Sequence, residues 1–122
     1  MFVLKWEKMS PKVAEQLASL VKGFDCQKKP MFGHEVYWIN GNMFAGVFED
    51  DIWIRLSRDD QGDYFEKYDD GKLFEPMAGR AMKDYVVLPE SVVANTEAAN
   101  EWIEKAYKFT AMLPEKKPKA KN

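Results

Sequence analysis

Residues 31–56 read Met31-Phe-Gly-His-Glu-Val-Tyr-Trp-Ile-Asn-Gly-Asn-Met-Phe-Ala-Gly-Val-Phe-Glu-Asp-Asp-Ile-Trp-Ile-Arg-Leu56. The stretch holds three apolar, aromatic-rich runs, separated by Asn40-Gly41 and by Glu49-Asp50-Asp51. Such short runs are typical of strands, and Asn-Gly between two of them is the strongest short-range signal for a β-hairpin. The stretch therefore predicts a three-stranded meander.

The apolar residues on each face of the predicted meander indicate which faces another part of the protein, a ligand or a partner must cover. In the third run, Ile52, Ile54 and Leu56 alternate with polar or amphipathic residues, which is the pattern of a strand with one buried face. The second run is apolar on both sides: strict alternation places Met43, Ala45 and Val47 on one face and Phe44, Gly46 and Phe48 on the other. We expect helices to cover one face, and the other face to meet a second layer, a ligand or a partner subunit.

The rest of the chain supplies helices and two more strands. Ser10-Pro11 is a helix start, the apolar positions that follow recur at helical spacing, and Gly23 marks the end. We expect a polar linker over 26–30, a short helix within 57–69, strands near 73–77 and 82–88, a turn over 90–94, and a helix capped by Asn95 or Thr96. The predicted fold is α+β, in the order α-β-β-β-α-β-β-α, with helices packed on the sheet.

Composition favours one soluble domain. A chain of 122 residues with 46% hydrophobic content can hold its own core, and its one cysteine cannot form an intrachain disulfide. No apolar run approaches the ~18 residues of a membrane helix, and residues 1–8 lack the features of a signal peptide. We expect a cytoplasmic protein without membrane association.

The C-terminal segment has a different charge from the body. Four lysines and one glutamate follow Pro114, so the remainder is more acidic than the net charge of -2 indicates. We expect a folded domain over 1–113 and a Lys-rich disordered tail over 114–122. An acidic body argues against a large phosphate-binding face, although the tail leaves weak nucleic-acid binding open.

The residues that could perform chemistry do not form a recognised constellation. His34 is the only histidine and has no second ligand or nucleophile beside it in sequence, so a structural or surface role is the favoured interpretation. Cys26 lies near Lys28 and Lys29, whose charges could lower its thiol pKa, but a linker or buried cysteine is the commoner case. Pairing of Cys26 with His34 lacks an orienting group. The acidic clusters do not follow the calcium-loop spacing, and the glycines match no phosphate-binding loop. We expect no enzyme activity, no cofactor and no metal.

Several short motifs carry a family resemblance. They are Lys29-Pro30-Met31-Phe32-Gly33, Gly41-Asn-Met-Phe-Ala, Phe74-Glu-Pro-Met, Met82-Lys-Asp-Tyr and Val87-Leu-Pro-Glu-Ser, ahead of the Trp102 helix. In this order the chain, from about residue 9 to 113, resembles the amino-terminal domain of the TfoX/Sxy family. The resemblance implies an α+β fold similar to secretion chaperones and kinship with regulators of natural competence. It also indicates a single-domain member, without the carboxy-terminal helical domain that usually follows.

The aromatic and basic residues of the meander are the best candidates for a binding surface. Tryptophan and arginine are enriched among interface residues that dominate affinity. We therefore take Trp38, Phe48, Trp53 and Arg55 as interface candidates, with core packing as the alternative for the two tryptophans. The leading hypothesis is a non-catalytic protein-interaction module, either a homodimer or a partner-binding adaptor. A nucleic-acid-associated regulator that uses the basic tail and a small-ligand-binding protein remain as alternatives.

Overall fold

The Asn40-Gly41 turn joins two neighbouring strands as expected. The computed structural model describes residues 10–31, 33–77 and 79–115, and there φ is 52° at Asn40 and 81° at Gly41. Positive φ at both central positions is what the favoured hairpin turn requires. Across it, β2 (Val36–Ile39) pairs with β3 (Asn42–Phe48), and β3 pairs with β4 (Asp51–Arg55). The predicted meander is confirmed.

The strands of the described residues form one antiparallel sheet of six. At one edge, β1 (Gln27–Lys28) pairs with β2. At the other edge, β5 (Lys72–Met77) and β6 (Arg80–Val87) form a hairpin, and β6 also pairs with β4. The strand order is β1-β2-β3-β4-β6-β5. The sheet thus places two distant parts of the chain, the meander and the later hairpin, side by side.

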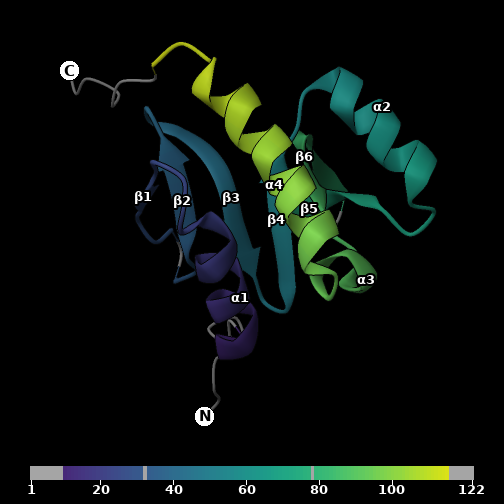
Figure 1. Ribbon diagram of the computed structural model, residues 1–122, viewed down its shortest axis with the longest axis horizontal. Coiled ribbons are helices and arrows are strands. Elements are labelled where there is room, and N and C mark those ends of the chain that lie inside the picture. Colours follow the sequence, from purple (N-terminus) through teal and green to yellow (C-terminus); the bar gives the residue numbers. More distant parts are fainter. Residues whose placement is uncertain (1–9, 32, 78, 116–122) are drawn as a thin grey trace.

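The described helices lie over one face of this sheet. They are α1 (Pro11–Val21), α2 (Arg58–Lys67), α3 (Glu90–Val93) and α4 (Thr96–Ala111), and Figure 1 shows α4 and α1 crossing the sheet. Side chains of Ser10, Ser57 and Asn95 cap the first turns of α1, α2 and α4 by accepting backbone N–H groups. The α+β class is confirmed.

The main core fills the space between helices and sheet. It joins Leu17 of α1 and Ile103 of α4 to Phe44 and Ile54 of the sheet, all with no exposed surface. Tyr64 of α2 is equally buried, and its hydroxyl donates a 2.6 Å hydrogen bond to the Val87 carbonyl. Each helix contributes to this core, because Val92 of α3 also belongs to it.

Two elements depart from the expected order. The predicted polar linker over 26–30 contains β1, although its residues have no strand pattern in the sequence. Pairing with β2 at the edge of the sheet orders them, and the Lys29 N–H donates a 2.8 Å hydrogen bond to the Val36 carbonyl beside this pairing. The predicted turn over 90–94 contains the single-turn helix α3, which the burial of Val92 holds against the core. The first run begins as a strand only at Val36, while Met31 and His34 form an isolated bridge.

A β-bulge overturns the predicted faces of β3. Tyr37 pairs with Ala45 but Trp38 pairs with Met43, so Phe44 is an extra residue in the register. A bulge of this kind breaks strict alternation. Phe44 therefore joins the core under the helices, whereas Met43 packs on the opposite face. The prediction that Met43 shares a face with Ala45, and Phe44 with Gly46, is wrong.

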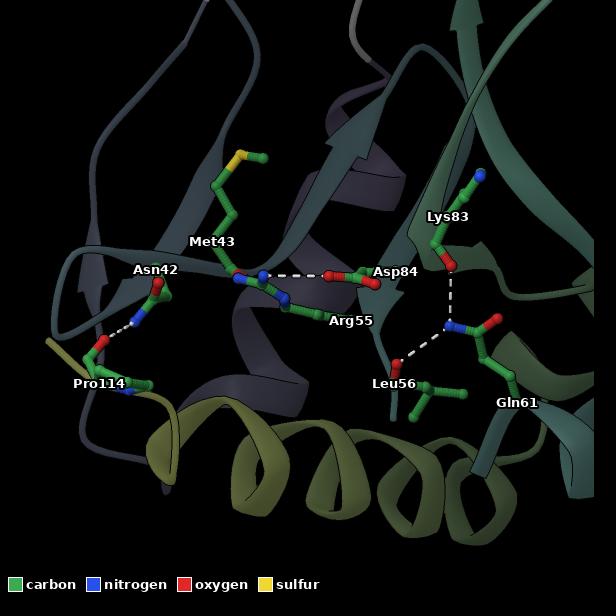
Figure 2. Close-up of polar contacts among 8 residues, drawn as sticks. All are labelled: Asn42, Met43, Arg55, Leu56, Gln61, Lys83, Asp84 and Pro114. Carbon is green, nitrogen blue, oxygen red and sulfur yellow. Dashed lines mark hydrogen bonds and ion pairs between the residues drawn. The ribbon is translucent and has the colours of Figure 1, made fainter. Parts of the chain in front are cut away.

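The predicted Lys-rich tail falls mostly on residues 116–122, which lie outside the described residues. Its first residue is tied to the sheet, since the Pro114 carbonyl accepts a 3.0 Å hydrogen bond from Asn42 Nδ2 (Figure 2). The strand end at β3 therefore holds the segment that follows α4.

Candidate interaction surface

A second apolar group lies on the sheet face that the helices leave uncovered. We call it the open face. Its residues are Val36, Trp53, Phe74, Tyr85 and Val87, which are buried, and Met31, Trp38, Met43, Phe48 and Met82, which are partly buried. None of these ten residues belongs to a helix, whereas each of the four helices contributes to the core on the other face.

Trp53 is the centre of the open face. It is only 2% exposed, and its ring stacks on Phe74, with centroids 5.2 Å apart and planes 18° apart. Its edge meets Tyr85 at 5.3 Å. Trp53 is paired across the strands with Gly46, and a Cβ at position 46 would lie 2.3 Å from Trp53 Cζ2. The indole can lie flat over β3 only because residue 46 has no side chain.

A cavity of about 410 Å³ opens beside this aromatic group. Seven residues of the open face line it, together with His34, Val47 and Pro76. Among the described residues that line it, none is Asp, Glu, Lys or Arg. A concave, largely apolar site of this size is typical of small-molecule pockets and of the anchor pockets of protein interfaces.

Phe48 and His34 form one wall of the cavity. Their rings stack with centroids 5.0 Å apart and planes 27° apart, and Phe48 meets Phe74 edge to face at 5.5 Å. His34 is 6% exposed, and Phe48 is half-buried. Ring contacts therefore connect His34, which precedes β2, and Phe48 of β3 to Phe74 of β5 along the cavity.

Arg55 lies at the polar border of the open face. Its Nη2 is 3.2 Å from Asp84 Oδ2, and its Nη1 donates to the Met43 carbonyl at 3.5 Å (Figure 2). The guanidinium carbon is 5.2 Å from the centroid of the Tyr85 ring, a distance that favours cation–π attraction. Burial raises the pKa of Tyr85, and the Arg55 charge opposes that rise in part.

Trp38 lies at the other border, near the β1 edge. Its Nε1 donates a 3.0 Å hydrogen bond to the Lys29 carbonyl, and the Lys29 ammonium is 5.5 Å from its ring centroid. The side chain is half-buried. Trp38 thus has a fixed orientation and leaves part of its surface accessible.

The structure brings all four sequence candidates to one face. Trp38, Phe48 and Arg55 are partly exposed there, while Trp53 forms the buried floor. Sequence reasoning missed the share of the β5–β6 hairpin, which contributes Phe74, Met82 and Tyr85. The alternation of Tyr85 and Val87 with Val86 and Leu88 was the available signal, because it indicates a strand with two apolar faces.

The residues considered for chemistry do not come together. Cys26 packs against the core on the helix side, whereas His34 lines the cavity on the open face. Burial, followed by the charge of Asp25, raises the pKa of the Cys26 thiol, which agrees with the favoured interpretation as a linker or buried cysteine and not with the alternative of a thiol activated by Lys28 and Lys29. Among residues 10–31, 33–77 and 79–115, no three His, Cys, Asp or Glu side chains gather as a metal site.

A larger cleft of about 540 Å³ lies elsewhere, between α1, the β3–β4 turn and α3. Lys12, Asp50, Asp51 and Glu90 border it. We base the candidate site on the smaller cavity, because its lining belongs mostly to the open face and includes the aromatic rings of that face.

Comparison with known protein families matches most of the chain. The family model of the TfoX N-terminal domain matches residues 15–110, which is most of the chain. No curated protein and no solved structure matches at a significant level, and the expected likeness to secretion chaperones stays a prediction. In the part of the chain that the structure describes, no helix is both long enough and apolar enough to cross a membrane.

Proposed function

Because the chain belongs to the TfoX N-terminal domain family, we propose that it is a non-catalytic protein-interaction module whose contact surface is the open face. One observation carries the proposal. A whole side of the sheet holds a second apolar cluster, and among the described residues no helix covers it. Uncovered apolar patches bordered by polar groups are typical of interaction sites.

The accessible residues of the open face have the chemistry of interface anchors. Trp38, and Arg55 at the border of this face, belong to the residue types that dominate binding energy, and Phe48 adds a partly exposed ring that lines the cavity. Their positions are fixed by the Lys29 carbonyl, by Asp84 and by His34 respectively. A pre-ordered surface loses less conformational entropy when a partner binds.

The partner in this proposal is a protein, either a second copy of the chain or another polypeptide. Kinship with competence regulators, implied by the family, suggests that the interaction serves regulation in the cytoplasm. Catalysis is not part of the proposal, because Cys26 and His34 lie on opposite faces of the sheet.

The test is a quantitative pull-down from host lysate with nuclease treatment as a second arm. We compare the wild type with Trp38→Ala and Phe48→Ala, and use Met112→Ala as the control, since Met112 is 81% exposed and lies outside the open face. Trp53 is left intact because it supports the face from beneath.

We expect a stoichiometric partner, or self-association, that survives nuclease, persists in Met112→Ala and falls at least tenfold in the two open-face variants. Circular dichroism verifies that each variant is folded. Association that is unchanged in both open-face variants contradicts the proposal. Enrichment that disappears with nuclease favours the nucleic-acid alternative, and removal of residues 115–122 then shows whether the tail is responsible.

A further inference from the structure

We propose that the cavity on the open face is a binding site for a compact, uncharged aromatic small molecule. This inference goes beyond the protein-interaction proposal and does not depend on it, because one chain supplies the ten described residues that line the cavity. It rests on the size of the cavity, the charge of its lining and the arrangement of its rings.

The size of the cavity sets the size of the ligand. Its volume of about 410 Å³ falls within the range of small-molecule pockets. At the packing density of protein interiors it holds about 300 Å³ of ligand atoms, enough for a compound with two or three fused rings. A single inserted methyl or isopropyl group would leave most of the space to water.

The charge of the lining sets the charge of the ligand. Within residues 10–31, 33–77 and 79–115, the cavity is lined by apolar side chains and His34, and by no acidic residue, lysine or arginine. An ionised group inserted here would lose hydration and gain no partner of opposite charge from a carboxylate, ammonium or guanidinium. The lining therefore complements a neutral compound.

The rings of the cavity favour an aromatic compound over an aliphatic one. Two stacked pairs, His34 with Phe48 and Trp53 with Phe74, line the space. Offset and edge-to-face contacts with such rings add stabilisation beyond the buried area. The floor is rigid because the Trp53 ring rests on Gly46.

Three methionines make the rim adaptable. Met31, Met43 and Met82 line the cavity and are partly buried, and thioether side chains adjust to the shape of a ligand and contact aromatic rings favourably. The methyl groups of these three methionines can report ligand binding. Met77 and Met112, which are 63% and 81% exposed and lie outside the lining, provide the comparison.

The test is a titration of the full chain, labelled with ¹³C at its methionine methyl groups, with 2-naphthol. We expect saturable shifts at Met31, Met43 and Met82 and no comparable shifts at Met77 and Met112. Binding of 2-naphthalenesulfonate, the charged analogue of similar shape, should be at least tenfold weaker. Met82→Trp fills the cavity and should weaken 2-naphthol binding at least tenfold, while the matched control Met112→Trp should leave it unchanged.

The methyl map does not depend on any variant, so it decides the question even if Met82→Trp is unstable. Absence of saturable shifts, or shifts of similar size at Met112, overturns the site. Equal binding of the sulfonate overturns the inferred charge. Tighter binding of a saturated alcohol such as 1-decanol overturns the aromatic class. Loss of partner association with retained 2-naphthol binding separates failure of the interaction proposal from failure of this one.

Discussion

Substitution of Gly46 by alanine tests whether the open face is built around the Trp53 ring. The added Cβ would lie 2.3 Å from Trp53 Cζ2 and 2.6 Å from Cε2, well inside van der Waals contact. Phe74 stacks on the ring and Tyr85 meets its edge, so any displacement of the indole disturbs these two ring pairs. Alanine at position 46 must therefore displace the indole or bend β3.

The magnitude follows from three contributions. Overpacking in a well-packed cluster costs about 1–3 kcal/mol, and a disturbed ring pair loses about 0.5–1.5 kcal/mol. Replacement of glycine offsets this by about 0.4–1 kcal/mol, because the unfolded chain has less conformational freedom. We expect the free energy of unfolding to fall by about 2 kcal/mol, which lowers the melting temperature by about 6–10 °C.

The assay is urea unfolding of Gly46→Ala in the wild-type background and in a Trp53→Leu background. With the indole removed, the same glycine substitution should be neutral or stabilise by up to about 1 kcal/mol, so the two sites should be coupled by about 2 kcal/mol.

Gly62→Ala is the matched control. Gly62 is exposed in α2 and has nothing within 4 Å of its added Cβ, so this substitution should stabilise by about 1 kcal/mol. An equal cost of Gly46→Ala in both backgrounds, or a cost below about 0.5 kcal/mol in the wild type, would refute the reasoning.

Three further predictions concern the helix side of the sheet. Tyr64→Phe removes the 2.6 Å hydrogen bond to the Val87 carbonyl and should lower the free energy of unfolding, measured in urea at pH 8, by about 1–2 kcal/mol. An unchanged free energy of unfolding would show that this hydrogen bond does not stabilise the fold. Burial raises the pKa of Tyr64 above its ordinary value of 10.0, so as pH rises the unfolded chain loses this proton first and the folded state loses stability above pH 10. In Tyr64→Phe this loss of stability at alkaline pH should be smaller. An identical dependence of stability on pH in the two proteins would contradict the raised pKa. Gln61→Ala removes two hydrogen bonds, 3.0 and 2.9 Å long, to the carbonyls of Leu56, just after β4, and of Lys83 within β6 (Figure 2), and should lower the free energy of unfolding by about 2 kcal/mol; a change under about 0.5 kcal/mol would exclude this bridging role. Cys26, whose thiol pKa is raised by burial, should react with iodoacetamide more slowly than free glutathione at pH 8, and faster labelling would show an activated thiol.

The parts of the fold that depend on local chemistry could be predicted from the sequence. Asn40-Gly41 defines a turn through its positive φ values, and Ser10 and Asn95 define helix starts through their caps. The bulge at Phe44 could not be predicted, since the apolar residues on both sides of it fit either face equally well. Nor could β1, because two polar residues at an edge receive their order from β2 alone.

The candidate site could be predicted only in part, for a similar reason. Trp38, Phe48, Trp53 and Arg55 belong to one meander, and its alternation indicates a second, uncovered face. The exposure of Trp53 depends on Phe74 and Tyr85, which belong to the β5–β6 hairpin and contact Trp53 because β6 pairs with β4. The sequence of the meander does not indicate this long-range pairing.

Site-specific photo-crosslinking tests the central claim most directly. A benzophenone amino acid is introduced at Phe48 on the open face and, in a second protein, at Met112 outside it, and each is irradiated in host lysate. Our account predicts a discrete protein adduct, with a second copy of the chain or with another polypeptide, from position 48 and not from position 112. No adduct from position 48, or the same adduct in equal yield from position 112, would contradict the open face as the contact surface.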